Sequence, residues 1–291
     1  MKHLVTKILL ALVAAMPMLA TSAHAEMKIG IMSPRGAIAT MQRWGEMGKY
    51  LEKELGTTVK IVPLKPNETV EAVKNGSVEY VLTNPVLAVI LAKKLDGKPF
   101  ATMNTNSGSQ FAGVIIGSKK SGVTKAADLK GKKVMGFKFK RSAAAYVFQV
   151  KHMMDQGIDP HKDFAEFKES KKQDDIVLAV KVGVFDGGFV KSGLLETMAK
   201  EGKIKMDDVV VLDKKDDSLS HVHSTILYPE WTFTASAKSD DAATDKIKAA
   251  LLKLKQDDPA SKSARIAGFV DLVSLADLDS TLQALKLPPY E

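Results

Sequence analysis

The sequence predicts an α/β protein of two lobes, each a mostly parallel sheet flanked by helices, with a hinged cleft between them. Two successive series of short apolar strands and amphipathic helices predict this fold, because alternating strands and helices build parallel sheets through right-handed crossovers. After residue 212 the chain returns to strand and helix without a third series. We therefore expect residues 26–108 to begin lobe 1, residues 109–212 to form lobe 2, and residues 213–291 to return to lobe 1 with C-terminal helices.

The first series starts with a buried apolar strand at residues 28–32 and a turn at residues 33–36. A helix follows and ends at Gly56, and its apolar face carries Met41, Trp44, Leu51 and Leu55. A strand at 59–62, a short helix at 70–74, a strand at 80–82 and a helix start at 83–85 complete this series.

The second series has predicted strands at 113–116, 134–137 and 184–190, with helices at 141–156 and 174–181. In the last part of the chain, Ser239 is expected to cap a helix that runs to Leu254. Ser274 and Asp277 have the spacing of a capping box at the start of the final helix, which Pro288 ends. This helical tail is expected to pack back on lobe 1, so that the two segments crossing between the lobes act as hinges.

The first 25 residues have the pattern of a cleaved signal peptide. A basic start is followed by an apolar stretch of 13 residues at positions 8–20 and by Ala23-His24-Ala25, a small-x-small cleavage site. A membrane anchor is the alternative, but the stretch is shorter than the ~20 residues that span a bilayer. We expect the mature chain to begin at Glu26 and to be periplasmic, not membrane-embedded, and monomeric.

The composition excludes several classes of function. The 291 residues include 42 Lys+Arg, 34 Asp+Glu and no cysteine, so disulfides, zinc ribbons, iron–sulfur clusters and thiol nucleophiles are excluded. The paired lysines are interleaved with acids, which does not predict a nucleic-acid interface. Motifs of hydrolases, phosphate loops and dinucleotide sites are absent. We therefore expect a non-enzymatic protein without a cofactor.

Three strand-to-helix turns could face the cleft: residues 33–36, 83–85 and 138–142. Helix N-termini offer unpaired N–H groups and partial positive charge, which suit an anion. Arg35 and Arg141 add guanidinium groups that bind oxyanions through two parallel bonds. In the alternative interpretation Ser33 and Ser142 cap helices and both arginines lie in water.

Two further patterns could carry chemistry. Asp186, between Phe185 and two glycines at the end of a predicted strand, could accept a bond from a ligand hydroxyl or amine, or be an ordinary turn residue. His221 and His223 would lie on the same face of a strand, a spacing found in metal sites, with Glu230 as a third ligand. The alternative is that both histidines are structural, and we expect no metal.

Several segments resemble the periplasmic phosphate/phosphite/phosphonate-binding proteins, a family of type II solute-binding proteins. The leader, the opening Lys28-Ile29-Gly30-Ile31 and the segment Gly183-x-x-Asp186-Gly-Gly carry this resemblance. The segments 82–85, 223–231 (His-Ser-Thr-Ile-Leu-Tyr-Pro-Glu-Trp) and 287–291 are similar to the branch used as sensor domains of tetrathionate-type histidine kinases.

The resemblance implies a set of ligand-binding positions. Ser142 falls on the first residue of a hydroxyl-rich loop that continues here with Ala143 and Ala144, and Asp186 falls on the family's acidic residue. Tyrosine positions appear as Glu68 and Phe111, and a histidine position as Gln173. These replacements should weaken phosphonate binding, at roughly 1 kcal/mol per lost hydrogen bond. The expected ligand-binding residues are Arg35, Glu68, Asn84, Phe111, Arg141, Ser142, Ala143, Gln173, Asp186 and His223.

We therefore expect a solute-binding protein that closes its lobes over a small anion of the phosphate or phosphonate class for an ABC-type permease. One alternative is a ligand-sensing protein for a histidine kinase, acting in trans because no membrane helix follows Leu287. The other is a metal-dependent periplasmic enzyme built on His221, His223 and Glu230.

Overall fold

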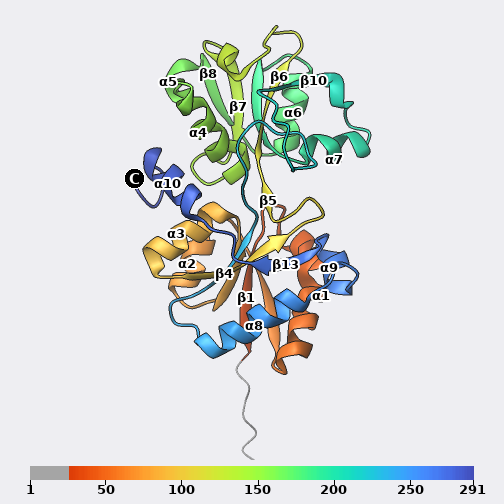
Figure 1. Ribbon diagram of the computed structural model, residues 1–291, viewed down its shortest axis with the longest axis vertical. Coiled ribbons are helices and arrows are strands. Elements are labelled where there is room, and N and C mark those ends of the chain that lie inside the picture. The colour runs from red at the N-terminus through yellow and green to blue at the C-terminus, as the bar shows by residue number, and fades with distance from the viewer. Residues whose placement is uncertain (1–25) are drawn as a thin grey trace, which may run out of the picture.

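The computed structural model describes residues 26–291 and shows two lobes, one above the other in Figure 1. Each lobe is a sheet with helices on its faces, so the predicted fold class is confirmed. The predicted signal peptide at residues 1–25 lies outside the described residues. Within residues 26–291, every helix is too short or too polar to cross a membrane.

A six-stranded sheet forms the lower lobe of Figure 1, which we call lobe 1. Its strands, in spatial order, are β13 (Gly268–Asp271), β4 (Lys98–Asn104), β12 (Thr232–Ala235), β3 (Tyr80–Thr83), β1 (Met27–Met32) and β2 (Val59–Leu64). β1 runs parallel to β2 and β3, whereas β12 and β13 run antiparallel to their neighbours. The chain therefore leaves this sheet after β4 and returns to it with β12.

A five-stranded sheet forms the upper lobe, which we call lobe 2. Its strands, in spatial order, are β10 (Val209–Leu212), β6 (Gly113–Ser118), β9 (Gly187–Lys191), β7 (Lys133–Phe137) and β8 (Glu166–Ser170). β7, β8 and β9 are parallel, and β6 is the reversed strand. Parallel strands end at the same edge of a sheet, and in this lobe that edge faces lobe 1 (Figure 1).

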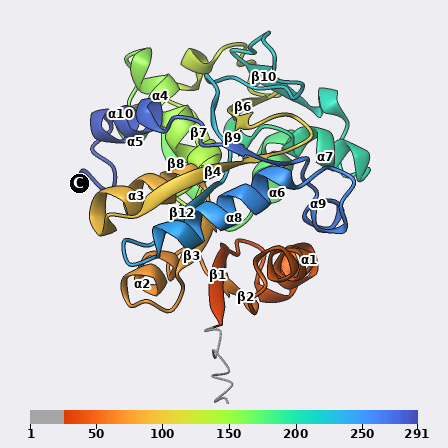
Figure 2. The same ribbon diagram turned by 60° about the horizontal axis from the view of Figure 1, so that its bottom comes forward.

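Helices cover both faces of each sheet, as the alternation of strand side chains requires. Lobe 1 carries α1 (Ala37–Leu55), α2 (Thr69–Lys74), α3 (Pro85–Leu95), α8 (Asp241–Lys253) and α9 (Pro259–Ala264). Along β3, Tyr80 and Leu82 pack with α1 and α8, whereas Val81 packs with α2 and α3. Figure 2 shows α8 crossing one face of the sheet and α2 with α3 grouped apart from α1.

Lobe 2 follows the same rule. Its helical segments are η1 (Ala126–Leu129), η2 (Ala143–Val147), α4 (Phe148–Asp155), α5 (Pro160–Asp163), α6 (Gln173–Lys181), α7 (Leu194–Lys200) and η3 (Met206–Asp208). Along β6, Val114 and Ile116 pack with α6 and α7, whereas Ile115 packs with η2 and α4. The final helix, α10 (Ala276–Ala284), lies at the junction of the lobes: it packs on α3 and shares a core with Phe148 of α4.

Two short strands, β5 (Gln110–Phe111) and β11 (Tyr228–Pro229), pair where the chain passes between the lobes. Side-chain bonds fix this crossing: Thr225 Oγ1 accepts from Gly113 N at 3.0 Å, and Ser224 Oγ accepts from Ile115 N at 2.9 Å. The segment 223–231, which carries the most specific resemblance, therefore builds the connection between the lobes. We call these paired segments the hinge.

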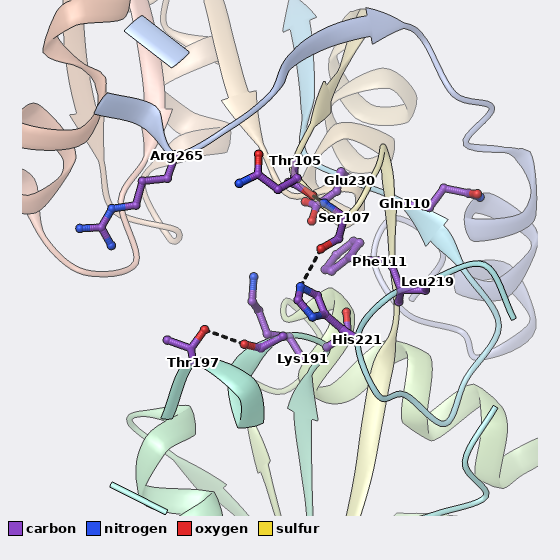
Figure 3. A pocket seen from close by; sticks show the side chains of 13 residues that line it. Thr105, Ser107, Gln110, Phe111, Lys191, Thr197, Leu219, His221, Glu230 and Arg265 are labelled. Carbon is purple, nitrogen blue, oxygen red and sulfur yellow. Dashed lines mark hydrogen bonds between the residues drawn. The ribbon is translucent and has the colours of Figure 1, made fainter. Parts of the chain in front are cut away.

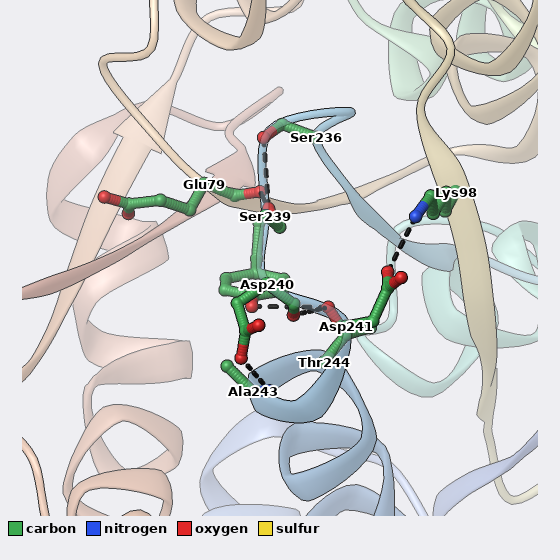
Figure 4. Close-up of polar contacts among 9 residues, drawn as sticks. Glu79, Lys98, Ser236, Ser239, Asp240, Asp241, Ala243 and Thr244 are labelled. Carbon is green, nitrogen blue, oxygen red and sulfur yellow. Dashed lines mark hydrogen bonds and ion pairs between the residues drawn. The ribbon is translucent and has the colours of Figure 1, made fainter.

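Three predicted helix starts were wrong in detail. Asp240, not Ser239, caps α8, with its carboxylate accepting from Ala243 N at 2.8 Å; Ser239 instead donates to Glu79 O (Figure 4). Ser274 makes no capping box, because it accepts from Ala276 N and α10 begins after residue 275. The helix predicted at 141–156 is the π-helical turn η2 followed by α4.

Two other predictions differ from the structure. Met41 is exposed on α1, while Trp44 and Leu51 are buried as expected. The strand predicted at 184–190 is β9 at 187–191, because Val184 lies in an exposed turn after α6. Asp186 therefore precedes the strand and does not lie at its end.

A glycine at the start of β6 permits tight packing around the buried Gln149. A Cβ on Gly113 would lie 2.5 Å from the Gln149 side-chain amide, whose Nε2 donates to three carbonyl oxygens. We expect Gly113→Ala to lower the free energy of unfolding by about 1–3 kcal/mol through overpacking. Gly45→Ala in α1, where a Cβ meets open space, should raise it by up to about 1 kcal/mol. Urea unfolding of both variants measures this, and equal values for the two would contradict it.

Candidate functional site

The loop 138–142 follows the carboxyl end of β7 and touches lobe 1. Lys138 and Lys140 both have positive φ, 45° and 66°, a conformation that disfavours side chains and recurs at functional sites. The peptide oxygen of Arg141 accepts a bond from Asn84 Nδ2 at 3.3 Å. Asn84 also caps α3 by accepting from Leu87 N. The predicted turn 83–85 of lobe 1 is thus in direct contact with the predicted turn 138–142 of lobe 2.

A cavity of about 310 Å³ lies between the lobes on the hinge side (Figure 3). We call it the hinge cavity. It is lined by residues from segments 105–111 and 191–197, by Leu219 and His221, and by Glu230 and Arg265. Phe111 forms part of its wall and packs edge-to-face on Phe148. Among the predicted ligand residues, Phe111 lines this cavity.

Cationic side chains reach the hinge cavity from both lobes. Lys191 ends β9 of lobe 2, and Arg265 follows α9 of lobe 1 in a left-handed conformation, φ 55°. Figure 3 shows them on opposite sides of the opening. Arg43 lies close by, with Nε donating to Ala264 O at 2.7 Å. Burial of its guanidinium, together with the neighbouring Arg265 and Arg35, lowers the pKa of Arg43, and Glu230 opposes this effect.

Glu230 is the buried acid of the hinge cavity, only 6% exposed. Trp231 N donates to its Oε2 at 3.2 Å. Desolvation raises the pKa of Glu230 above its ordinary value of 4.5, and the cations Lys191 and Arg43 pull in the opposite direction. The cavity therefore joins positive charge from both lobes with one carboxyl group that resists ionisation.

Hydroxyl groups supply hydrogen bonding around this charge. A tight turn links Thr105 and Gly108, and Ser107 Oγ lies 2.7 Å from His221 Nε2 (Figure 3). Ser192 Oγ accepts from Ala112 N at the opposite wall. Gly193 has a positive φ, and a Cβ there would lie 3.0 Å from the His221 ring, so glycine is what lets the ring sit against this wall.

A second cavity, of about 370 Å³, lies by the loop 138–141 and the end of the chain. Its lining includes Lys138, Lys140 and Arg141 with Glu169, Pro288 and Glu291. Lys140 pairs with Glu291 at 3.1 Å. Arg141, predicted as a ligand residue, therefore lines this cavity and not the hinge cavity.

The remaining predicted ligand residues lie in different places. Arg35 is exposed in the turn before α1, and Ser142 and Ala143 are buried at the start of η2. Glu68 is exposed before α2 and pairs with Lys65. Gln173 Oε1 accepts from Lys191 N at 2.9 Å, so Gln173 positions the end of β9 behind the cavity wall.

Asp186 lies at the opposite edge of the lobe 2 sheet from the hinge cavity. Its Oδ2 accepts from Lys133 N at 2.9 Å and its N donates to Lys133 O, which ties the beginnings of β7 and β9 together. The cavity, by contrast, lies where β9 ends at Lys191. This geometry favours the alternative interpretation of Asp186 as a turn residue.

The two histidines are not on a strand and do not converge. His223, 1% exposed, lies between His221 O and Asp217 Oδ2, at 2.9 and 3.0 Å, while His221 contacts Ser107. Glu230 is bonded to Trp231 N instead. Within residues 26–291, no group of three or more His, Asp or Glu side chains is arranged to hold a metal ion. The predicted placement of both histidines on one face of a strand was therefore wrong.

Sequence reasoning missed Lys191 and Arg265 as cavity residues, and Arg43 as a cation close to the cavity. Lys191 carried a usable signal, because it follows an apolar strand at the edge where ligands bind in open α/β sheets. Arg265 and Arg43 carried no signal in the sequence, since the packing of α9 against α1 is what brings them near the cavity. Glu230 was considered only as a metal ligand.

Comparison with known proteins places the chain among solute-binding proteins. Residues 29–278 match the family described as ABC transporter, phosphonate, periplasmic substrate-binding protein. The chain is 32% identical over 249 residues to the tetrathionate sensor histidine kinase TtrS of Salmonella typhimurium, covering 83% of this chain and 42% of that protein. It thus spans less than half the length of this relative.

Solved structures show the same fold at low identity. PhnD1 from Prochlorococcus marinus in complex with methylphosphonate has a TM-score of 0.71 at 15% identity, over 90% of this chain and 98% of that one. XAC2383 from Xanthomonas citri bound to ATP has a TM-score of 0.74, with the same identity and coverage.

The raised pKa of Glu230 predicts a pH-dependent stability. A carboxyl group whose folded pKa lies above its unfolded value contributes stability below about pH 4.5, which is lost as pH rises through the folded pKa. We therefore expect Glu230→Gln, which keeps an acceptor for Trp231 N, to melt at higher temperature than the wild type near neutral pH. This difference should shrink toward pH 4.

Thermal unfolding from about pH 4 to pH 8 measures the effect, with Glu52→Gln, an exposed position on α1, as the control. The control should differ from the wild type by the same small amount at every pH. A constant offset for Glu230→Gln would contradict the prediction.

Proposed function

Because the chain belongs to the family of periplasmic substrate-binding proteins of phosphonate ABC transporters, we propose that it captures a small oxyanion in the hinge cavity. The observation that carries this proposal is the placement of Lys191 and Arg265, which bring positive charge to one cavity from different lobes. An anion bound between them contacts both lobes at once.

Such a ligand would favour the closed arrangement of the lobes. A ligand shifts a conformational equilibrium only by its difference in affinity for the two states. Residues of lobe 1, lobe 2 and the hinge line the same cavity, so opening would separate the ligand from at least one cation. The contact between Asn84 and Arg141 O would break in the same motion.

The lining favours an oxyanion over an apolar solute. Thr105, Ser107 and Ser192 place hydroxyl groups beside the cations. Hydrogen bonds from charged donors to sulfonate or phosphonate oxygens are stronger than hydrogen bonds between neutral groups. Methylphosphonate is bound by the related PhnD1, and tetrathionate is the signal named for the related kinase. Both ions are therefore included among the ligands to be tested. Arg35 is proposed as a further cation at the rim of the site.

The partner is proposed to be an ABC permease, which is the role that the matching family describes. A second role is supported by the similarity to TtrS, which covers 83% of this chain: delivery of the closed form to a sensor kinase. A strain that lacks this protein separates the two roles. Loss of growth on the anion as a nutrient would indicate the transport role, and loss of anion-dependent gene induction would indicate the sensing role.

We expect Lys191→Ala and Arg265→Ala each to weaken anion binding by about 10- to 100-fold. Charge-assisted hydrogen bonds contribute about 1.5–3 kcal/mol, and 1.4 kcal/mol corresponds to a tenfold change in Kd. Titration calorimetry with tetrathionate, methylphosphonate, inorganic phosphate and sulfate measures the loss.

Lys200→Ala is the matched control, because this exposed lysine ends α7 and does not line the hinge cavity. Arg141→Ala reports on the second cavity. If Arg141→Ala abolished binding while Lys191→Ala and Arg265→Ala did not, the ligand would bind by the loop 138–142 and the assignment of the hinge cavity would fail.

The protein is proposed to act in the periplasm after removal of residues 1–25. We expect mass spectrometry of a periplasmic extract to give a chain that begins at Glu26. A full-length chain in the membrane fraction would contradict this location.

A further inference from the structure

We infer that Glu230 determines which anions the hinge cavity accepts: it favours ligands that present a proton toward the hinge, and it couples binding of fully ionised anions to uptake of one proton. This inference rests on the proposed function, since it assumes that an anion occupies this cavity.

The backbone holds Glu230 in a fixed position at the hinge. Its N donates to Ser109 O on the crossing segment at 2.9 Å, and its O accepts from Thr232 Oγ1 at 3.2 Å. The strands on either side, β11 and β12, are paired with β5 and with β3 and β4. The main chain of Glu230 is therefore fixed beside the cavity that its carboxyl group lines.

The carboxyl group has unused capacity for hydrogen bonds. Trp231 N is its one described donor, on Oε2, whereas an ionised carboxylate offers about four acceptor sites. Among residues 26–291, Glu230 forms no direct ion pair, although Lys191 and Arg43 are near enough to influence it. Because Glu230 lines the cavity, a proton carried by the ligand could satisfy the carboxylate.

Charged groups surround Glu230 from several elements. Lys191 comes from β9, Arg43 from α1 and Arg265 from the end of α9. Arg35, in the turn before α1, influences Arg43. His221, with Glu196 of α7 at 3.7 Å, lies at the other wall. Lysine and arginine stay charged between pH 5 and 8. Burial raises the pKa of Glu230 from its ordinary value toward this range.

An anion that binds beside the cations adds a negative charge near Glu230, which favours protonation of the carboxyl group. Hydrogen phosphate and monoprotonated methylphosphonate carry their own proton and can donate it to Glu230. Tetrathionate and sulfate carry none, so they require Glu230 to be protonated. Their affinity should then fall by up to tenfold per pH unit as pH rises above the pKa of Glu230 in the unliganded protein toward its higher pKa in the complex.

Calorimetry of the wild type and of Glu230→Gln with tetrathionate and sulfate, between about pH 5.5 and pH 8, tests this. Each titration is repeated in two buffers with different ionisation enthalpies, which counts the protons taken up. We expect uptake approaching one proton by the wild type, no uptake by Glu230→Gln, and tighter, pH-independent binding by the variant near pH 8. For inorganic phosphate the variant should lose at least part of the affinity for the protonated ion.

His221→Gln is the matched control, since it removes an imidazole that lines the same cavity and should retain the proton uptake. Uptake lost in His221→Gln but kept in Glu230→Gln would overturn the inference and leave the proposed function standing. Binding without any proton uptake by the wild type would overturn it as well, with no variant needed. No binding of any of these anions by the wild type would overturn the proposed function itself, and the inference with it.

Discussion

The pairing of the two segments that cross between the lobes is the constraint on which the rest of this structure depends. β5 and β11 form only two residue pairs, yet Ser224 and Thr225 extend this connection with side-chain bonds to the backbone of β6. Unpaired backbone groups are costly inside a protein, so these hydroxyl groups fix the register of the crossing. That register places Phe111 and Glu230 at one cavity, and it brings the ends of both sheets to face each other.

The electrostatics of the hinge cavity follow from this arrangement. Open α/β sheets present strand ends and helix termini to a shared cleft, where charge from distant parts of the chain can gather. Here Lys191 and Arg265 meet across the cleft although they lie far apart in sequence. Glu230 is buried among cations but not directly paired with them, which explains why desolvation outweighs their attraction. This combination of buried acid and nearby cations is what the proposed capture of an anion rests on.

The loop 138–147 covers the positions where the family resemblance implies a hydroxyl-rich ligand loop. Two lysines adopt left-handed conformations, and Ala144 and Ala145 interrupt the helical geometry within η2. Strain of this kind persists only where surrounding structure holds it. The alanines at 143 and 144 remove hydroxyl donors, and the loop instead contacts lobe 1 through Arg141 O. The proposed site therefore lies at the hinge cavity, where hydroxyl groups and cations are available.

The sequence by itself determined the fold class, the two lobes, most strands and the helix start at residues 83–85, because these depend on local periodicity and local turn signals. It did not determine the site. Asp186 precedes β9 and Lys191 ends it, so the two residues lie at opposite edges of the sheet. The sequence pattern placed Asp186 at the end of this strand and therefore predicted it, and not Lys191, at the cleft. Arg265 joins the cavity through the packing of α9 on α1, and the two histidines separate because they lie in a loop. Such contacts join residues far apart in the chain, so only the tertiary structure could decide them.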